Sequence, residues 1–164
     1  MLRVHSIETF GTHEGPGIRL VVFLQGCNFR CLYCHNPDTQ NMTGGTLIQS
    51  EEIIDLLEKQ KTYFKNNGGL TVSGGEPLLQ RQGLIDLFTK VKKAGFNIAL
   101  DTNGSVFDEH TKKLLEVTDL VLLDVKHIDP ALHQKVTNAS NTGTLKLAKY
   151  LNDINKPVWL RYVL

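Results

Sequence analysis

Five short runs of apolar and largely β-branched residues recur along the chain and predict buried strands. The runs are Ile18–Gln25, Gly69–Ser73, Asn97–Asp101, Leu120–Lys126 and Val158–Leu164. Near-continuous apolar character is typical of strands that are covered on both faces, as they are in parallel sheets. Upstream of these runs, residues 1–14 carry only a short alternating segment before a glycine-rich turn.

Amphipathic helical patterns separate the runs. Glu51–Asn66 and Leu84–Ala94 each place their apolar residues on one side. Ser50 is the predicted N-cap of the first helix, and Gly95 is predicted to end the second. The other helical signals are Asp108 before Glu109, Asp129 before Pro130, and the stretch Thr142–Asn152. Strands that alternate with helices predict right-handed βαβ units and therefore an α/β fold with parallel strands.

Composition changes this picture little. With 164 residues, 41% apolar and 21% charged, the chain is expected to form a single globular domain over residues 1–164. A net charge of +1 gives no electrostatic reason to expect nucleic acid or a membrane as a partner. The sequence contains no run of 18 apolar residues and no signal-peptide pattern, so we expect a cytoplasmic protein.

All three cysteines lie within eight residues, at Cys27, Cys31 and Cys34. Thiolates on one loop can converge on a soft metal centre, which would be zinc, copper(I) or an iron–sulfur cluster. A four-iron cluster normally takes four cysteines, so three would leave one iron open to a small molecule. The spacing therefore suggests a redox cluster with a free coordination position.

Three other interpretations of the cysteine loop stay open. His35 could complete a Cys3His zinc site, although it directly follows Cys34 and both side chains would have to point at one ion. Residues 31–35 also match the C-x-x-C-H pattern of c-type haem attachment, which usually follows export. A disulfide framework is disfavoured by the odd number of cysteines.

Polar residues follow the predicted strands one by one. The cysteine loop follows the first strand, and the next three strands end in Ser73-Gly74-Gly75-Glu76-Pro77, Asp101-Thr102-Asn103-Gly104 and Asp124-Val125-Lys126. Each segment alone could be a solvated turn or a helix cap. Because functional groups collect at the carboxyl ends of parallel strands, we expect these segments to form one site.

The order of these motifs resembles the radical S-adenosylmethionine (SAM) enzymes. Gly15-Pro16-Gly17-Ile18-Arg19 is followed by a strand, by the cysteine loop with Tyr33 before its last cysteine, and by residues 73–77. Within this superfamily the chain is most similar to the glycyl-radical-enzyme activating proteins of the pyruvate formate-lyase type. The resemblance runs from about Ile7 to the last residue.

The resemblance implies a fold and a reaction. The fold is a partial (β/α)6 barrel with about five βα units in this chain, whereas six units need roughly 190 residues. We therefore expect that a C-terminal part of the domain is missing after Leu164. The implied reaction is reductive cleavage of SAM at a [4Fe–4S] cluster held by the three cysteines. The resulting 5′-deoxyadenosyl radical takes a hydrogen from a glycine Cα of a partner enzyme.

The resemblance also implies which residues bind SAM. Gly74 and Gly75 would hold the amino group, while Glu76 either assists or only shapes the turn. Lys126 would bind the carboxylate and is, with the cysteines, counted among the catalytic residues. The remaining SAM contacts are assigned to Tyr33, Cys34, His35, Asn103, Asp124 and Val125.

A monovalent cation, Na⁺ or K⁺, is implied near the SAM carboxylate. Its ligands would be Asp101, Thr102, Asp124 and the carbonyl of Leu122, which are hard oxygen donors. The alternative for the two aspartates is an ion pair with Lys126.

Partner contacts are implied at two positions. Glu14 stands where the family more often has Asp, and Arg161 is the second candidate. Pyruvate formate-lyase would be the protein substrate, and a flavodoxin- or ferredoxin-like protein would supply the electron. Two alternatives stay open: an activase of anaerobic ribonucleotide reductase or another glycyl radical enzyme, and a zinc-binding regulatory module in which residues 74–77 and Lys126 have no role.

Overall fold

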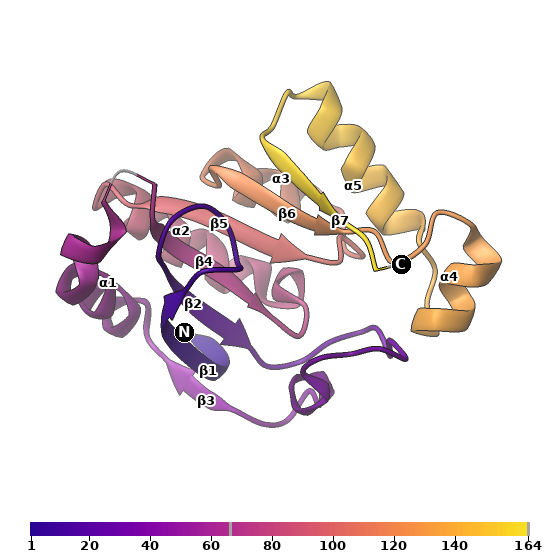
Figure 1. Ribbon diagram of the computed structural model, residues 1–164, viewed down its shortest axis with the longest axis horizontal. Coiled ribbons are helices and arrows are strands. Elements are labelled where there is room, and N and C mark those ends of the chain that lie inside the picture. The colour runs from indigo at the N-terminus through magenta and orange to yellow at the C-terminus, as the bar shows by residue number, and fades with distance from the viewer. Residues whose placement is uncertain (66, 164) are drawn as a thin grey trace.

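A seven-stranded sheet of order β3-β1-β2-β4-β5-β6-β7 forms the centre of the molecule in the computed structural model, which describes residues 1–65 and 67–163 (Figure 1). The strands are β1 (Leu2–Gly11), β2 (Arg19–Leu24), β3 (Thr46–Ile48), β4 (Gly69–Gly74), β5 (Asn97–Thr102), β6 (Leu120–Asp124) and β7 (Val158–Arg161). The five predicted runs are β2, β4, β5, β6 and β7, and each pairs in parallel with the next. The α/β fold with a parallel, partial barrel sheet is therefore confirmed.

Two strands were not predicted. β1 pairs antiparallel with β2 and β3 pairs antiparallel with β1, which extends the parallel sheet at one edge. The pairing of β1 shifts register between Val4 and Ser6 and again between Glu8 and Gly11. These irregularities interrupt the two-residue alternation that identifies a strand in a sequence. β3 is three residues long and largely exposed, so it has no hydrophobic pattern.

The helices are α1 (Ser50–Phe64), α2 (Arg81–Lys93), α3 (Glu109–Glu116), α4 (Pro130–Thr137) and α5 (Thr142–Asp153), with short 3-10 turns η1 (Pro37–Gln40) and η2 (Pro77–Gln80). The caps predicted at Asp108 and Asp129 are confirmed, since each carboxylate accepts an N–H of the first helical turn. Gly95 follows α2 with φ +85°, as predicted for the residue that ends this helix. No helix in the described part of the chain is both long enough and apolar enough to cross a bilayer.

Several boundaries differ from the prediction. Ser50 is the first residue of α1 and not its N-cap, because Gln49 and Glu52 form a reciprocal capping box instead. α2 begins at Arg81 because η2 leads directly into it, and β6 and β7 end earlier than the apolar runs suggested. The predicted ends at Asn66 and Leu164 lie outside the described residues.

The two faces of the parallel strands have different roles. Alternate residues such as Leu20 and Val22 of β2 and Leu70 of β4 are fully buried against the helices in one apolar core. The residues between them face the other side, where Ser73 and Asp101 lie at the carboxyl ends of their strands. Because side chains alternate along a strand, each strand contributes to the core with one set and can contribute to a site with the other.

Candidate active site

A cavity of about 620 Å³ opens at the carboxyl ends of the parallel strands. It is lined by Glu14, Phe23, Cys27, Phe29, Cys31, Tyr33, Cys34, His35, Asn36, Ser73, Gly74, Gly75, Asp101, Thr102, Asn103, Asp124, Lys126, Leu160, Arg161, Tyr162 and Val163. The cysteine loop and the polar segments after β4, β5 and β6 thus meet in one place, as the order of the segments predicts. Such a position is where α/β folds of this kind bind their ligands.

Three predicted site residues, Glu76, Leu122 and Val125, do not line this cavity. Leu122 is fully buried inside β6, and Glu76 is fully buried beneath the wall. The backbone N–H of Val125 donates to the Arg161 carbonyl at 3.0 Å. Direct ligand contacts of these three residues remain predictions.

The cysteine loop leaves β2 and runs out to α4 (Figure 1). The N–H groups of Arg30 and Leu32 donate to the carbonyls of Thr137 and Val136 at 2.8 and 2.9 Å. These carbonyls belong to the last turn of α4, where a helix leaves its acceptors free. Phe29 is buried edge-on against the His133 ring, with centroids 5.3 Å apart, and fixes the same stretch of loop.

The three thiols are of a kind that an iron–sulfur cluster can bind. All three cysteines are free, are partly buried and line the same cavity. Within residues 1–65 and 67–163, no three His, Cys, Asp or Glu side chains are close enough together to hold one metal ion. A zinc site would need its donors gathered around one ion, whereas a four-iron cluster takes each thiolate at a different iron. Three free, partly buried thiols around one cavity are of the type and number that a [4Fe–4S] cluster with one open iron would take.

Burial opposes ionisation of two of the thiols, Cys27 and Cys31. Burial raises the pKa of Cys27 to about 11, against the N–H of Phe29, which lowers it. Burial also raises the pKa of Cys31, and the nearby Lys126 ammonium opposes the change. Because iron binds thiolate, loading of the cluster must displace protons from the loop.

The glycine segment after β4 brings the strand against the cysteine loop. A Cβ on Gly75 would lie 2.1 Å from the carbonyl oxygen of Gly26, so any side chain there would push away the turn that leads to Cys27. Gly74 has φ +116°, a conformation that side-chain-bearing residues rarely adopt. The geometry of the cavity wall therefore requires glycine at both positions.

Glu76 shapes this wall from below. Its carboxylate accepts the N–H of Leu78 at 2.9 Å, the hydroxyl of Thr102 at 2.6 Å and the N–H of Asn103 at 2.7 Å. Burial raises its pKa to about 7, although these hydrogen bonds favour the ionised form. Glu76 thus ties the end of β4 to the end of β5, which is the turn-shaping role that the sequence left open.

Two aspartates and two cations alternate across the cavity. Lys126 Nζ lies 2.9 Å from Asp124 and 5.7 Å from the centre of the Tyr33 ring. The Arg161 guanidinium contacts both Asp101 and Asp124, with 3.3 Å between Nε and Asp124 Oδ1. The ion pair weighed for Lys126 is therefore present with Asp124, whereas Asp101 pairs with Arg161.

The balance of charge decides the ionisation of these groups. Burial alone would lower the pKa of Lys126, but the Asp124 carboxylate outweighs it and the pKa is raised. Burial raises the pKa of Asp101, and the Arg161 charge opposes this. Lys126 therefore stays a cation that is partly buried and available to an anionic ligand group.

The sequence interpretation gave no role in the site to Ser73 or Phe29, although both lie in motifs that it singled out. The Ser73 hydroxyl donates to Asp101 at 2.7 Å, and a two-residue alternation along β4 would have placed it on the cavity face. No local pattern predicts that Phe29 packs against α4.

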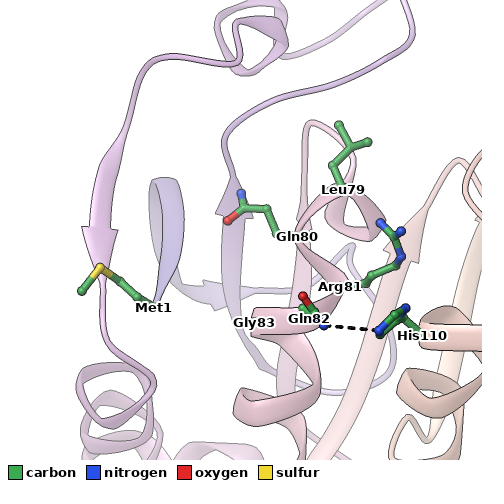
Figure 2. A pocket seen from close by; sticks show the side chains of 7 residues that line it. All are labelled: Met1, Leu79, Gln80, Arg81, Gln82, Gly83 and His110. Carbon is green, nitrogen blue, oxygen red and sulfur yellow. Dashed lines mark hydrogen bonds between the residues drawn. The ribbon is translucent and has the colours of Figure 1, made fainter.

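A second cavity, of about 300 Å³, lies at the start of α2 (Figure 2). There the side-chain nitrogen Nε2 of Gln82 lies 3.2 Å from Nε2 of the His110 ring. The residues of this cavity took no part in any predicted site.

Comparisons with known proteins identify the family of this chain. The model of the radical SAM superfamily matches residues 21–164. A pyruvate formate-lyase-activating enzyme of Listeria monocytogenes is 47% identical over 169 aligned positions, which cover 99% of this chain and 68% of the relative. The pyruvate formate-lyase 1-activating enzyme of Escherichia coli is 48% identical over 167 aligned positions, and the alignment covers 98% of this chain and 67% of that enzyme.

Solved structures show the same fold. A domain of a pyruvate formate-lyase-activating enzyme from Bacteroides vulgatus is 31% identical, with a TM-score of 0.55 over 59% of this chain and 60% of that one. The Streptococcus suis SuiB protein, at 19% identity, shares only the fold, with a TM-score of 0.72 over 94% of this chain and 33% of that one. The chain therefore belongs to the radical SAM superfamily and, within it, to the family of pyruvate formate-lyase-activating enzymes.

Proposed function

We propose that this chain activates pyruvate formate-lyase by SAM-dependent formation of a glycyl radical. The observation that carries the proposal is the meeting of three free thiols with polar side chains from the ends of parallel strands around one cavity. The relatives at 47% and 48% identity are named for this activation. Their family implies a [4Fe–4S] cluster and SAM, and the thiols are of the type that such a cluster takes.

Cys27, Cys31 and Cys34 would hold the cluster. When bound, the cluster supplies the electron that cleaves SAM to methionine and a 5′-deoxyadenosyl radical, which takes hydrogen from the glycine Cα of the partner. The protein's task is to bind, orient and shield. Lys126 is a partly buried cation and would bind the SAM carboxylate, because an ammonium binds such a group as a point charge.

The rest of the SAM molecule would lie along the cavity wall. The backbone at Gly74 and Gly75 can approach the amino group closely because no side chain intervenes. Tyr33 and His35 both line the cavity next to Cys34 and would face the adenine.

A monovalent cation is proposed between the two aspartates. Asp101 and Asp124 lie on neighbouring strands, and Arg161 and Lys126 now balance their charge. If Arg161 turns toward the partner enzyme, a cation held by Asp101, Thr102, Asp124 and the Leu122 carbonyl would replace its charge. Oxygen donors of this kind suit such an ion.

Arg161 and Glu14 are the proposed partner contacts, since both line the cavity. A glycine Cα can reach the cavity only as an extended loop of the partner. We also propose that a flavodoxin- or ferredoxin-like protein donates the electron and that the reaction takes place in the cytoplasm, where free thiols persist.

The experiment is an activation assay under strict exclusion of oxygen. The reconstituted chain is reduced with SAM and pyruvate formate-lyase, and the glycyl radical is quantified by EPR beside 5′-deoxyadenosine by chromatography. The proposal requires both products. A radical that forms only on an anaerobic ribonucleotide reductase would assign the chain to that partner instead, and the absence of 5′-deoxyadenosine would refute SAM cleavage.

A further inference from the structure

Asn103 lies directly after β5, on the cavity wall beside the cysteine loop, and is 7% exposed. Three of its four polar groups have partners that hold it in place. Its backbone N–H donates to Glu76 at 2.7 Å, and its carbonyl accepts the Thr144 hydroxyl at 2.6 Å. Its side-chain Oδ1 accepts the N–H of Ser105 at 2.8 Å. Only the side-chain NH2 remains to be assigned.

The bond from Ser105 decides which way the Asn103 amide faces. Rotation of the amide by half a turn would set its NH2 against the Ser105 N–H, leaving two donors without an acceptor. In the orientation that avoids this, Nδ2 points at Cys27 Sγ, 4.0 Å away. The backbone N–H of Phe29 donates to the same sulfur at 3.4 Å.

The loop that carries Asn103 is fastened to the cysteine loop at a second point. The Ser105 hydroxyl and the Asn28 side-chain amide exchange hydrogen bonds of 2.9 and 3.1 Å. Gly143 at the start of α5 makes room for this arrangement, because a Cβ there would lie 2.1 Å from the Ser105 carbonyl oxygen. The amide of Asn103 is therefore held beside Cys27 from both sides.

Cys27 differs from the other two cysteines in this respect. Its sulfur receives two N–H groups, one from the backbone and one from a side chain. Cys31 is approached by its own backbone N–H, but within the residues that the structure describes no hydrogen bond from another residue reaches the sulfur of Cys31 or Cys34. The site is thus asymmetric around the three thiols.

We propose that Asn103 is a positioning residue that donates a hydrogen bond to the Cys27 thiolate of the bound cluster and thereby raises the reduction potential of the cluster. The inference rests on the proposed function, since it presupposes a cluster on the three cysteines. An N–H that points at a thiolate stabilises the more negative, reduced state more than the oxidised state. Hydrogen bonds to cluster sulfurs are one of the factors that set the potential. Asn103 acts through Cys27 and needs no contact with SAM.

The test is a redox titration of the cluster-loaded chain, followed by low-temperature EPR, for the unchanged protein and Asn103→Leu. Leucine keeps the branched outline of asparagine, with two methyl groups in place of the amide oxygen and nitrogen, and removes the donor. We expect a lower midpoint potential, by a threefold to tenfold change in the reduction equilibrium, or about 28–59 mV at 59 mV per tenfold for one electron. Asn103→Asp keeps the acceptor for the Ser105 N–H but turns an oxygen toward Cys27, and it should shift the potential in the same direction.

Thr144→Val is the matched control, because it loosens the same loop and leaves the amide beside the sulfur. Its midpoint should equal that of the unchanged chain. An unchanged potential in Asn103→Leu overturns the proposal, and so does an equal shift in Thr144→Val, because the position of the loop would then be responsible.

Loss of the cluster from both Asn103 variants also overturns the proposal. The proposal states that Asn103 tunes the potential of a cluster that has already formed, and not that it is needed for assembly. Iron and sulfide analysis of the unchanged chain separates this inference from the proposed function. A chain that binds no cluster refutes the proposed function. A cluster whose potential ignores Asn103→Leu refutes this inference alone.

Discussion

Replacement of Glu76 by glutamine should change how stability depends on pH. Burial raises the pKa of Glu76 from its ordinary value of 4.5 to about 7 in the folded chain. The folded state then binds the proton more tightly than the unfolded state does. The resulting stabilisation is fully present below pH 4.5 and is lost as pH rises through about 7. Glu76→Gln removes this titration and keeps the size of the side chain.

The magnitude follows from the pKa difference and the contacts of the carboxylate. At 1.36 kcal/mol per pH unit, the whole effect is on the order of 3 kcal/mol, of which roughly 2–3 kcal/mol falls between pH 5 and pH 8. Glutamine also turns an NH2 toward the Asn103 N–H, and a buried unpaired donor costs about 1–3 kcal/mol at any pH. The variant should therefore be less stable than the unchanged chain at pH 5. The difference in the free energy of unfolding between the two proteins, called the stability gap below, should narrow toward pH 8.

The assay is urea unfolding of the cluster-free, reduced chain and of Glu76→Gln at several pH values. Glu116→Gln is the matched control, because it makes the same chemical change at an exposed position in α3. The stability gap between Glu116→Gln and the unchanged chain should stay constant over these pH values. A constant gap for Glu76→Gln would mean that Glu76 does not titrate in this range, and a widening gap would reverse the sign of the argument.

Three further changes test other parts of the account. Replacement of any one of the three cysteines by serine should abolish stoichiometric iron binding under anaerobic reconstitution, and iron retained in all three variants would contradict the ligand assignment. Lys126→Met should weaken SAM binding roughly 10- to 100-fold at unchanged iron content, because a charge-assisted hydrogen bond is lost. An unchanged dissociation constant for SAM would mean that the SAM carboxylate binds elsewhere. Arg19 is fully buried and donates to the carbonyls of Pro16, Asn67 and Leu70. Arg19→Met would leave these buried acceptors unpaired, so it should lower the free energy of unfolding measured in urea by about 3–5 kcal/mol. A decrease below about 1 kcal/mol would contradict this structural role.

The parallel strands and the place of the site could be predicted because each rests on a local pattern. Apolar runs identified the five parallel strands, and the rule that ligands bind at strand carboxyl ends brought the cysteine loop and the aspartates together. β1 escaped because its irregular pairing with β2 interrupts the alternation of apolar and polar residues. The N-cap of α1 escaped because the box is formed by Gln49 and not by the more common Ser50.

The long-range contacts of the site could not be predicted from the sequence. Arg161 meets Asp101 across 60 residues, and the Asn103 amide meets Cys27 across 76. Glu76 lies in a segment that is typical of a turn, and its role depends on two groups that only the pairing of β4 with β5 brings within reach. Such contacts depend on the relative placement of strands and loops, which no local pattern contains.

The measurement that tests the central claim most directly is a low-temperature EPR spectrum of the reduced, reconstituted chain with and without SAM. The account predicts a [4Fe–4S]⁺ signal whose g-values change when SAM is added, because three cysteines leave one iron free to bind it. A stoichiometric zinc content without iron, or a cluster signal that SAM leaves unaltered, would contradict the account.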